Sequence, residues 1–460
     1  MHYSTFVRQF ILIVAALTVP ITAQAGLIRD AEIEHTLRAY AQPILEAADI
    51  PTRDVRIFII ANPTINAYVA GGLNIFLHTG LIRNTKNPGM LIGVLAHETG
   101  HISGAHLSQF TEKSNRALIG SLLGAAISAA VIGGAIATQG RVGRDAGQAS
   151  IGAIAGTQSM IQRQILGDIR LNEQSADHAA LAFLDANAIS ATGMLEMFEA
   201  LRRQESGGTS KDPFLLTHPL TTDRIATIRN HVAQSNIPAD QVPEEFRAMH
   251  ARMLAKLVAF TEPYETTLTL YPASDTSVAA RYARAIAEFK RSHLTEALAG
   301  MNALIKSNPK DPFFYDTKGQ ILFENGKVVE AAAAYAKAHS LMPDSALILT
   351  DYAKTLIAQE DSTLLPRAIT LLEQSRDLDD SYDLTWRQLA LAYGKQGKLG
   401  LSYKALAEEA VLGGDYETAL QHLARARELA GDDPALILQI DDLDRDVKAQ
   451  WKEKKEGSLF

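Results

Sequence analysis

Apolar residues recur along the first half of the chain with two different spacings. In residues 26–46, 91–106 and 168–186 they return about every three to four positions, which predicts helices with one buried face. Residues 55–60 and 68–77 are short apolar stretches rich in β-branched and aromatic residues, which predicts strands. This part of the chain is therefore expected to be a helix-rich α+β domain with a small sheet.

The last third of the chain shows an internal repeat. Pro309 and Pro343 lie 34 residues apart, and Tyr315 and Trp386 each precede a Gly-Lys pair by 11 residues. A helix–turn–helix period of this length resembles the tetratricopeptide repeat, and we expect about four units between residues 277 and 434. Such repeats stack into an α-solenoid that binds segments of other proteins. Generic alanine-rich helical hairpins are the alternative.

Net charge, the N-terminal sequence and the absence of cysteine restrict the partners and the cellular compartment that we expect for this protein. The 460 residues carry a net charge of −8 without a long basic run, so no nucleic-acid partner is expected. Arg8, the apolar residues 10–21 and the triplet Ala23-Gln24-Ala25 predict a secretory signal peptide over residues 1–25. An uncleaved anchor is the alternative. With no cysteine for a lipid or a disulfide, the chain is expected in a bacterial periplasm.

The helix predicted over residues 91–106 contains the sequence His97-Glu98-Thr99-Gly100-His101. Histidines four residues apart lie on one face of a helix, so both imidazoles can reach one metal ion. Glu98 lies beside that face, where a carboxylate can act as general base without binding the metal. We therefore expect a catalytic Zn²⁺ site, with one ion per chain, held in part by His97 and His101.

A catalytic zinc site needs a third protein ligand. The metzincin pattern would require a histidine at position 107, which is Leu107, and His106 lies about 140° round the helix from His101. A carboxylate from the helix over 168–186 is the better candidate, and Glu173 is the strongest. Asp177 follows one turn later and is placed to accept the second N–H of a ligand histidine. A solvated charged face is the alternative explanation of this acidic pair.

Gly71 and Gly72 interrupt the second predicted strand. Paired glycines in a strand indicate a bulge or a close approach of another backbone, and an edge strand here would hold an extended peptide by strand addition. An ordinary hairpin turn explains them equally well.

Residues 117–138 are uncharged and long enough to cross a bilayer. A single crossing would place the histidine pair and Glu173 on opposite sides of the membrane, and residues 147–165 are too polar for a return span. We therefore expect a helix or hairpin that packs on the domain or touches a membrane surface, rather than a true span.

Three sequence features together resemble one family. H-E-T-G-H, then N-E-Q-S-A-D around Glu173, then Thr217-His218-Pro219 with the downstream Arg224, are similar to the gluzincin metallopeptidases related to HtpX and the CAAX prenyl proteases. A signal peptide and C-terminal repeats resemble the branch of beta-barrel assembly-enhancing proteases. The usual acidic residue two places after the metal glutamate is Ser175 here, which leaves Glu173 and Asp177 intact.

The resemblance implies a fold and roles for these residues. It implies a zincin-type α+β metalloprotease domain over residues 26–262 and a repeat domain over 277–450. Residues 263–276, which contain several threonines, a serine and prolines, are expected to be a linker. His97, His101 and Glu173 would bind zinc, Glu98 would be the general base, and His218 would be a switchable extra ligand that keeps the enzyme latent. His218 and Arg224 are both candidates for stabilising the oxyanion.

The implied function is a periplasmic zinc endopeptidase that degrades misfolded or stalled outer-membrane proteins and assists their assembly. Its repeats would dock it to the barrel assembly machinery, with peripheral membrane contact through residues 117–138. Two other classes stay open. One is a chaperone or scaffold whose zinc site is held shut, and the other is an integral membrane protease.

Overall fold

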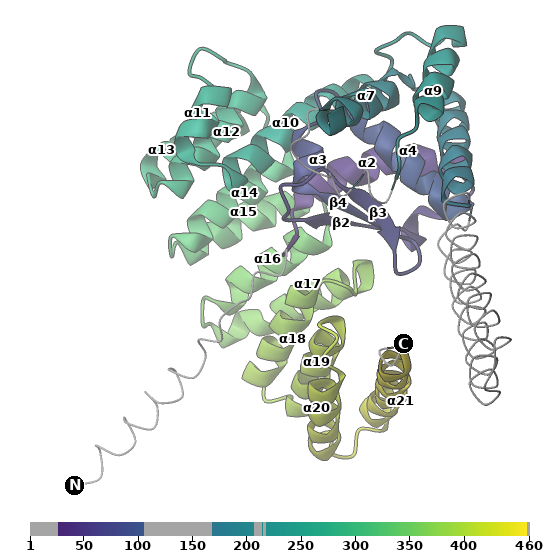
Figure 1. The fold of residues 1–460 in the computed structure, drawn as a ribbon. Coiled ribbons are helices and arrows are strands. Elements are labelled where there is room, and N and C mark those ends of the chain that lie inside the picture. Colours follow the sequence, from purple (N-terminus) through teal and green to yellow (C-terminus); the bar gives the residue numbers. More distant parts are fainter. Residues whose placement is uncertain (1–25, 105–167, 207–213, 215–217, 458–460) are drawn as a thin grey trace, which may run out of the picture. The chain divides into compact units, whose positions relative to one another are not determined.

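The structure is a computed structural model that describes residues 26–104, 168–206, 214 and 218–457 (Figure 1). The chain divides into two compact units. The first contains Met1–Arg29 and Leu37–Arg247, and the second contains Ala248–Phe460 together with the short segment Asp30–Thr36. The predicted signal peptide and the apolar segment 117–138 lie outside the described residues. Among the described residues, no helix combines the length and apolar character needed to cross a bilayer.

The first unit contains a four-stranded sheet in the order β1-β2-β4-β3. Its strands are β1 (Leu27–Ile28), β2 (Arg56–Ile60), β3 (Ala67–Ala70) and β4 (Asn74–His78). β2 and β4 run parallel, while β3 is antiparallel to β4 and ends the sheet.

The glycine pair forms the turn of the β3–β4 hairpin. Gly71 and Gly72 have φ of 58° and 92°, a left-handed backbone that glycine adopts without strain. The hairpin turn, one of the two explanations left open by the sequence, is therefore the observed one, and β3 is in addition an edge strand among the described residues.

Helices before and after the strands carry most of the chemistry. The N-terminal helix α2 (Ala31–Ala47) covers most of the predicted 26–46, but the start of that stretch forms β1 instead, and α3 (Thr79–Arg83) follows β4. The motif helix is α4 (Pro88–Ser103), where the Asn87 side chain caps the start by accepting the Met90 N–H at 3.1 Å. A helix over residues 168–186, then α7 (Thr192–Ser206), α9 (Thr222–Gln234) and α10 (Glu244–Thr261), complete this part of the chain.

The second unit is built from antiparallel helix pairs. Its helices are α11 (Tyr264–Leu270), α12 (Val278–Lys290), α13 (Leu294–Ser307), α14 (Pro312–Glu324), α15 (Val328–Leu341), α16 (Ala346–Ile357), α17 (Leu365–Leu378), α18 (Asp383–Lys395), α19 (Leu399–Leu412), α20 (Tyr416–Leu429) and α21 (Pro434–Gly457). Gly326 and Gly397, the glycines of the Gly-Lys pairs, have positive φ at the turns between helices. The prediction of a mainly helical chain with a repeat solenoid is confirmed, and the helical pairs continue through α20 and α21.

A short helix occupies part of the stretch expected to be a linker. Residues 263–276 were expected to be a linker, and within them Tyr264–Leu270 forms α11 after Pro263. Thr267 is fully buried, and its hydroxyl donates to the Pro263 carbonyl oxygen at 3.2 Å. The threonines that suggested a linker therefore satisfy a helical backbone instead.

The first turn of α2 belongs to the repeat unit because of buried ion pairs. Lys256, only 1% exposed, lies 2.8 Å from Asp30 and 3.9 Å from the Asp316 carboxylate. Arg252 pairs with Glu32 at 2.5 Å, and Tyr282 donates its hydroxyl to Glu32 at 2.9 Å. The charges at the start of α2 are thus neutralised by residues more than two hundred positions later in the chain.

Candidate metal centre

Helix α4 places the motif residues in a buried position. His97 and Glu98 are fully buried, and His101 is slightly exposed. One helical turn separates the two histidines, which brings their Nε2 atoms to 3.2 Å. Both imidazoles therefore point at the same small volume.

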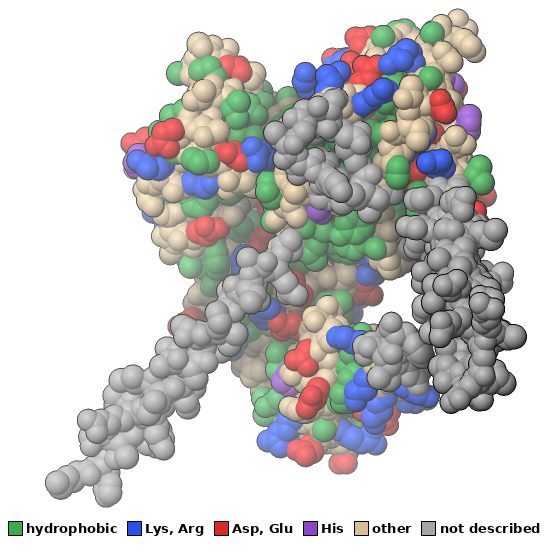
Figure 2. Space-filling model, viewed as in Figure 1, with side chains coloured by type: hydrophobic (Ala, Val, Ile, Leu, Met, Phe, Trp, Pro, Cys, Tyr) green, Lys and Arg blue, Asp and Glu red, His purple; other side chains and the backbone are tan. Residues whose placement is uncertain are grey.

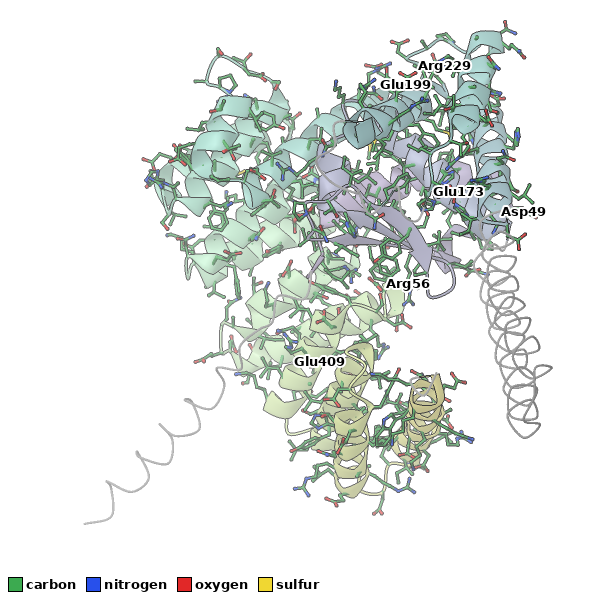
Figure 3. All side chains as sticks on the ribbon, viewed as in Figure 1. Asp49, Arg56, Glu173, Glu199, Arg229 and Glu409 are labelled. Carbon is green, nitrogen blue, oxygen red and sulfur yellow. The ribbon has the colours of Figure 1, made fainter. Side chains whose placement is uncertain are left out.

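The helix over residues 168–186 brings Glu173 to that volume. The Glu173 carboxylate oxygens lie 3.3 Å from His97 Nε2 and 3.2 Å from His101 Nε2. Figure 3 labels Glu173 among the side chains of the first unit. The structure thus joins the three residues that the sequence predicted as ligands, across seventy residues of chain.

His218 is the fourth member of the cluster. Its Nδ1 lies 3.0 Å from Glu173 Oε1 and 3.4 Å from His97 Nε2. One ligand atom from each of His97, His101, Glu173 and His218 falls within 4.8 Å of the others. The imidazole of His218 packs against the ring of Phe214, with centroids 4.7 Å apart. His218 therefore lies among the candidate ligands rather than on an open turn.

Asp177 lies behind the histidine pair. Its Oδ1 is 3.0 Å from His97 Nδ1, the nitrogen that does not face the cluster. A carboxylate in this position fixes the tautomer of a ligand histidine and leaves Nε2 free to bind a metal.

Arg224 connects the two carboxylates. Its Nε and Nη2 donate to Asp177 at 2.6 and 2.8 Å, and its Nη1 lies 2.7 Å from Glu173 Oε2. The guanidinium also lies over the ring of Phe198, 5.2 Å from its centroid. Because these donors are directed at the two acidic residues, the structure gives Arg224 a supporting position behind the cluster.

The two carboxyl groups are held in the ionised form. Burial acts to raise the pKa of Glu173, but hydrogen bonds from His101, His218 and His97 outweigh it and keep the pKa well below its usual range. Burial likewise opposes ionisation of Asp177, whose pKa is lowered overall by Arg224 and His97. A pair of buried carboxylates beside imidazoles is an environment that favours a divalent cation.

The two motif histidines have pKa values shifted in opposite directions. Burial lowers the pKa of His97, but its contacts with Asp177 and Glu173 are stronger and raise the pKa to about 9. Burial and the neighbouring His97 lower the pKa of His101 despite its hydrogen bond to Glu173. His101 is thus suited to bind a metal as neutral imidazole.

Glu98 provides a direct test of whether the residues fit a metal. Both of its carboxylate oxygens are buried without a hydrogen-bond partner among the described residues. Its closest titratable neighbour is His218 Nε2, at 3.6 Å, which is too long for a hydrogen bond. Buried polar atoms normally have partners, so this carboxylate is consistent with a site that takes up a cation and water. The donor set of two imidazoles and a carboxylate is the one found in catalytic zinc sites.

Glycine lets the two ligand-bearing helices touch, a feature that the sequence interpretation missed. A Cβ atom at Gly100 would lie 2.6 Å from the carbonyl oxygen of Ala176, which follows Glu173 on its helix. At Gly93, a Cβ atom would lie 2.6 Å from Met194 Cβ of α7. The available signal was the pair of glycines on one side of the motif helix.

Comparisons with known proteins find similarity to peptidases over the part of the chain that contains the ligand cluster. Residues 28–232 match the model of peptidase family M48. The beta-barrel assembly-enhancing protease of Escherichia coli is 26% identical over 408 residues, which cover 87% of this chain and 80% of that protein. The protein of the same name from Yersinia pestis is 24% identical over 407 residues, covering 88% of this chain and 81% of that protein.

A solved structure resembles the repeat helices. It is a thermophilic TPR protein from Thermus thermophilus, 18% identical, which matches over 36% of this chain and 98% of its own length with a TM-score of 0.25. The order and length of the helices of this chain, rather than this weak match, support the solenoid.

Proposed function

We propose that this protein, a metallopeptidase with a domain of family M48, is a periplasmic zinc endopeptidase that degrades misfolded or stalled outer-membrane proteins and assists their assembly. The observation that supports it most strongly is the convergence of His97, His101, Glu173 and His218 beside the unpartnered Glu98. The names of the relatives support the link to barrel assembly.

Each residue of the metal centre would have a separate role in peptide hydrolysis. His97, His101 and Glu173 would hold one zinc ion, which when bound supplies Lewis acidity and lowers the pKa of a coordinated water. Glu98 takes a proton from the attacking water and passes it to the leaving amine. Asp177 holds the His97 imidazole, and Arg224 fixes both carboxylates as a positioning residue.

His218 would act as a reversible fourth ligand. Its Nδ1 contact with Glu173, at 3.0 Å, puts it in the volume that a substrate carbonyl must enter. With His218 in place the enzyme is latent, and its withdrawal opens the site. When it is withdrawn, its imidazole is also a candidate donor to the oxyanion.

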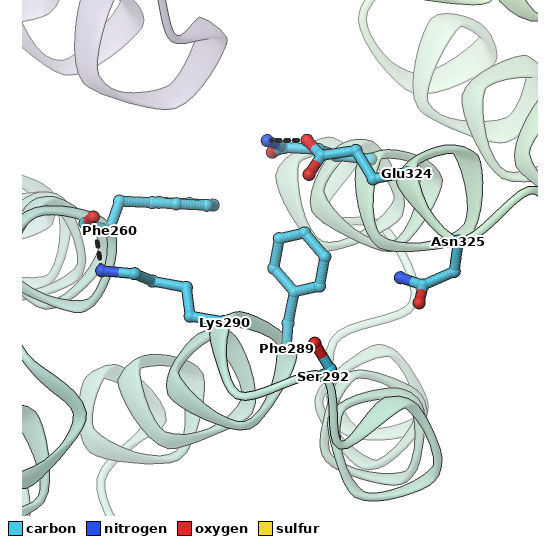
Figure 4. A pocket seen from close by; sticks show the side chains of 7 residues that line it. Phe260, Phe289, Lys290, Ser292, Glu324 and Asn325 are labelled. Atoms are coloured by element: carbon cyan, nitrogen blue, oxygen red, sulfur yellow. Dashed lines mark hydrogen bonds between the residues drawn. The ribbon is translucent and has the colours of Figure 1, made fainter.

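The repeat unit would bind partner proteins, including the barrel assembly machinery. Ten helices, from α12 to α21, follow the antiparallel arrangement of repeats that recognise protein segments. A pocket of about 380 Å³ opens between the ends of α10, α12 and α14, with Phe260 and Phe289 on its walls and Glu324 at its rim (Figure 4). Its volume and mixed lining suit a side chain of a bound polypeptide.

Export and membrane contact complete the proposal. The signal peptide over residues 1–25 would direct the chain to the periplasm, and residues 117–138 would touch a membrane surface. Extraction of the mature protein from membranes by carbonate without detergent is expected, and a need for detergent would favour the integral membrane protease instead.

The substitution Glu98→Gln tests the assignment as an endopeptidase. The amide cannot accept the proton, so cleavage of an unfolded outer-membrane protein should be lost while zinc content stays at one ion per chain. Cleavage by the variant at the wild-type rate would contradict the role of Glu98.

A chaperone or scaffold with a latent site is the second candidate, because His218, 3.0 Å from Glu173, would keep the site closed if it bound the metal permanently. If latency is the resting state of a protease, His218→Ala raises proteolysis. If cells that carry Glu98→Gln assemble barrels normally while a repeat-deleted form fails, the scaffold function is the correct one.

A further inference from the structure

Three aromatic rings cross one face of the sheet in the first unit. Phe58 of β2 lies opposite Phe76 of β4, and Phe76 lies opposite Tyr68 of β3. Each neighbouring pair is stacked with ring centroids 5.1 Å apart and planes inclined by 21° and 15°. We call these three residues the aromatic ladder. It runs across the strands and reaches the edge of the described sheet at Tyr68.

The aromatic ladder is partly accessible. All three of its residues are half-buried, whereas Ile59, Ile75 and Leu77, which alternate with them, are buried. Figure 2 shows hydrophobic side chains gathered over the strands of this region. The rings of the aromatic ladder are therefore partly exposed in a row, opposite a face whose central residues are buried.

The backbone of β3 is oriented so that an added strand would meet Tyr68 closely. The His78 N–H donates to the Asn66 carbonyl oxygen at 3.0 Å. Because hydrogen-bonded pairs alternate in an antiparallel ladder, Tyr68 faces Phe76 in such a pair, while the N–H and C=O groups of Ala67 and Val69 point away from β4. These groups form the edge at which, among the described residues, the sheet ends.

A polypeptide that adds antiparallel to this edge would bond to Ala67 and Val69. The residue opposite Tyr68 then sits in a non-hydrogen-bonded pair, in which Cα atoms approach to about 4.5 Å and side chains lie closest. Its neighbours on the same face lie beside the small Ala70 and the buried Asn66. One position of the bound segment thus meets the terminal ring of the aromatic ladder.

The strand at this edge contacts the helix of the metal centre. Of the described strands, β3 is the one that packs against α4, the helix that carries His97, Glu98 and His101. A metallopeptidase must bring an extended chain to that helix, so the occupant of this edge is a substrate segment rather than an unrelated partner.

We infer that Tyr68 is a specificity-determining residue, at which the aromatic ladder selects extended substrate segments that carry an aromatic side chain at the position paired with it. The inference rests on the proposed endopeptidase function and names its substrate class. Strands of outer-membrane barrels fit this class, because they alternate in side-chain direction and carry girdles of aromatic residues.

The experiment uses the full chain and short synthetic peptides of β-forming residues that differ at one position, which is phenylalanine, leucine or alanine. Scanning that position along the peptide locates the pairing register. Binding is measured by fluorescence anisotropy in the Glu98→Gln protein, and KM and kcat are measured with active enzyme. Stacking predicts that the phenylalanine peptide binds about threefold to tenfold better than the alanine peptide at one register, through KM rather than kcat.

Two substitutions distinguish the effect of the Tyr68 ring on binding from an effect on the fold. Tyr68→Phe keeps the ring and should keep the preference. Tyr68→Thr keeps a strand-forming residue and should lose the preference, so that the phenylalanine and alanine peptides bind with similar affinity.

The possible outcomes distinguish failure of the proposed endopeptidase function from failure of the inference about Tyr68. Cleavage of no peptide or protein by wild type or by His218→Ala would overturn the proposed function. Cleavage with no aromatic preference, or a preference that survives in Tyr68→Thr, would overturn the inference alone. A change in oligomeric state in Tyr68→Thr, with peptide selection unchanged, would overturn it in favour of contact between two copies of this chain.

Discussion

Replacing Gly100 with alanine tests how the protein sets the spacing of its metal ligands. Gly100 lies in α4 between Glu98 and His101, and it touches the backbone of Ala176 on the helix that carries Glu173. The contacts between His97, His101 and Glu173 span this crossing at 3.2 to 3.3 Å. A methyl group at the crossing should therefore separate the ligands without altering any of them.

The size of the displacement follows from the contact distances. A Cβ atom at Gly100 would lie 2.6 Å from the Ala176 carbonyl oxygen, and ordinary van der Waals contact begins at 3.4 Å. The helices must therefore move apart by roughly 0.8 Å, while metal sites tolerate about 0.2 Å in ligand distance. We expect zinc affinity to fall about 10- to 100-fold, as it does when a supporting contact of a metal site is lost.

Gly93→Ala provides a matched control on the same helix. Its Cβ atom would also lie 2.6 Å from a neighbour, but that neighbour is Met194 of α7. α7 contributes no residue to the ligand cluster. We expect each substitution to cost about 1–3 kcal/mol of stability through overpacking, and Gly93→Ala to keep its zinc affinity.

Zinc affinity is measured by competition with a chelator, and site geometry by the visible spectrum of the cobalt-substituted protein. Thermal unfolding of the metal-free proteins reports the stability cost separately. Unchanged zinc affinity in Gly100→Ala would show that the contact between Gly100 and Ala176 does not set the ligand spacing. Equal losses of affinity in both variants would show that any loosening of α4 has the same effect, and that the crossing at Ala176 is not special.

Two other predictions concern the charges around Glu173 and in the repeat unit. Arg224→Lys should lower zinc affinity by about tenfold in a calorimetric titration, because lysine cannot hold Asp177 and Glu173 with a planar fork. Burial raises the pKa of Asp316 to about 7, despite the nearby Lys256, so the folded state binds its proton more tightly than the unfolded chain. Its ionisation then removes stability as pH rises from about 4 to about 7, and Asp316→Asn should gain on the order of 2–4 kcal/mol over wild type at pH 8 but little at pH 4. Equal melting-temperature differences at the two pH values would contradict this sign.

The parts of the site that lie on single helices could be predicted from the sequence. His97 and His101, and again Glu173 and Asp177, are four residues apart, and helical periodicity alone places each pair on one face. The structure brings the histidine pair into contact with the acidic pair, with Asp177 Oδ1 lying 3.0 Å from His97 Nδ1. Local geometry was sufficient because each pair lies within one continuous helix.

The parts that depend on contacts distant in sequence could not be predicted in this way. No periodicity indicated that Asp30 and Glu32 would form ion pairs with residues of α10. Nor did it indicate that Arg224 would bind two acidic residues instead of being available to stabilise the oxyanion. The stretch expected to be a linker contains α11 because Thr267 is buried there, which its composition did not indicate. Such choices depend on which surfaces meet after folding.

The glycines show how the two kinds of information combine. Gly71 and Gly72 could mark a bulge or a turn, and the positive φ values decide for the turn. Gly100 carries no such local sign, since its backbone is helical, and its role appears only where Ala176 touches it. A helix pays a small cost in stability for a glycine inside it, of about 0.5–1 kcal/mol relative to alanine. In α4 this cost is offset by a contact close enough to bring Glu173 within reach of both histidines, so the spacing of the metal centre depends on a residue with no side chain.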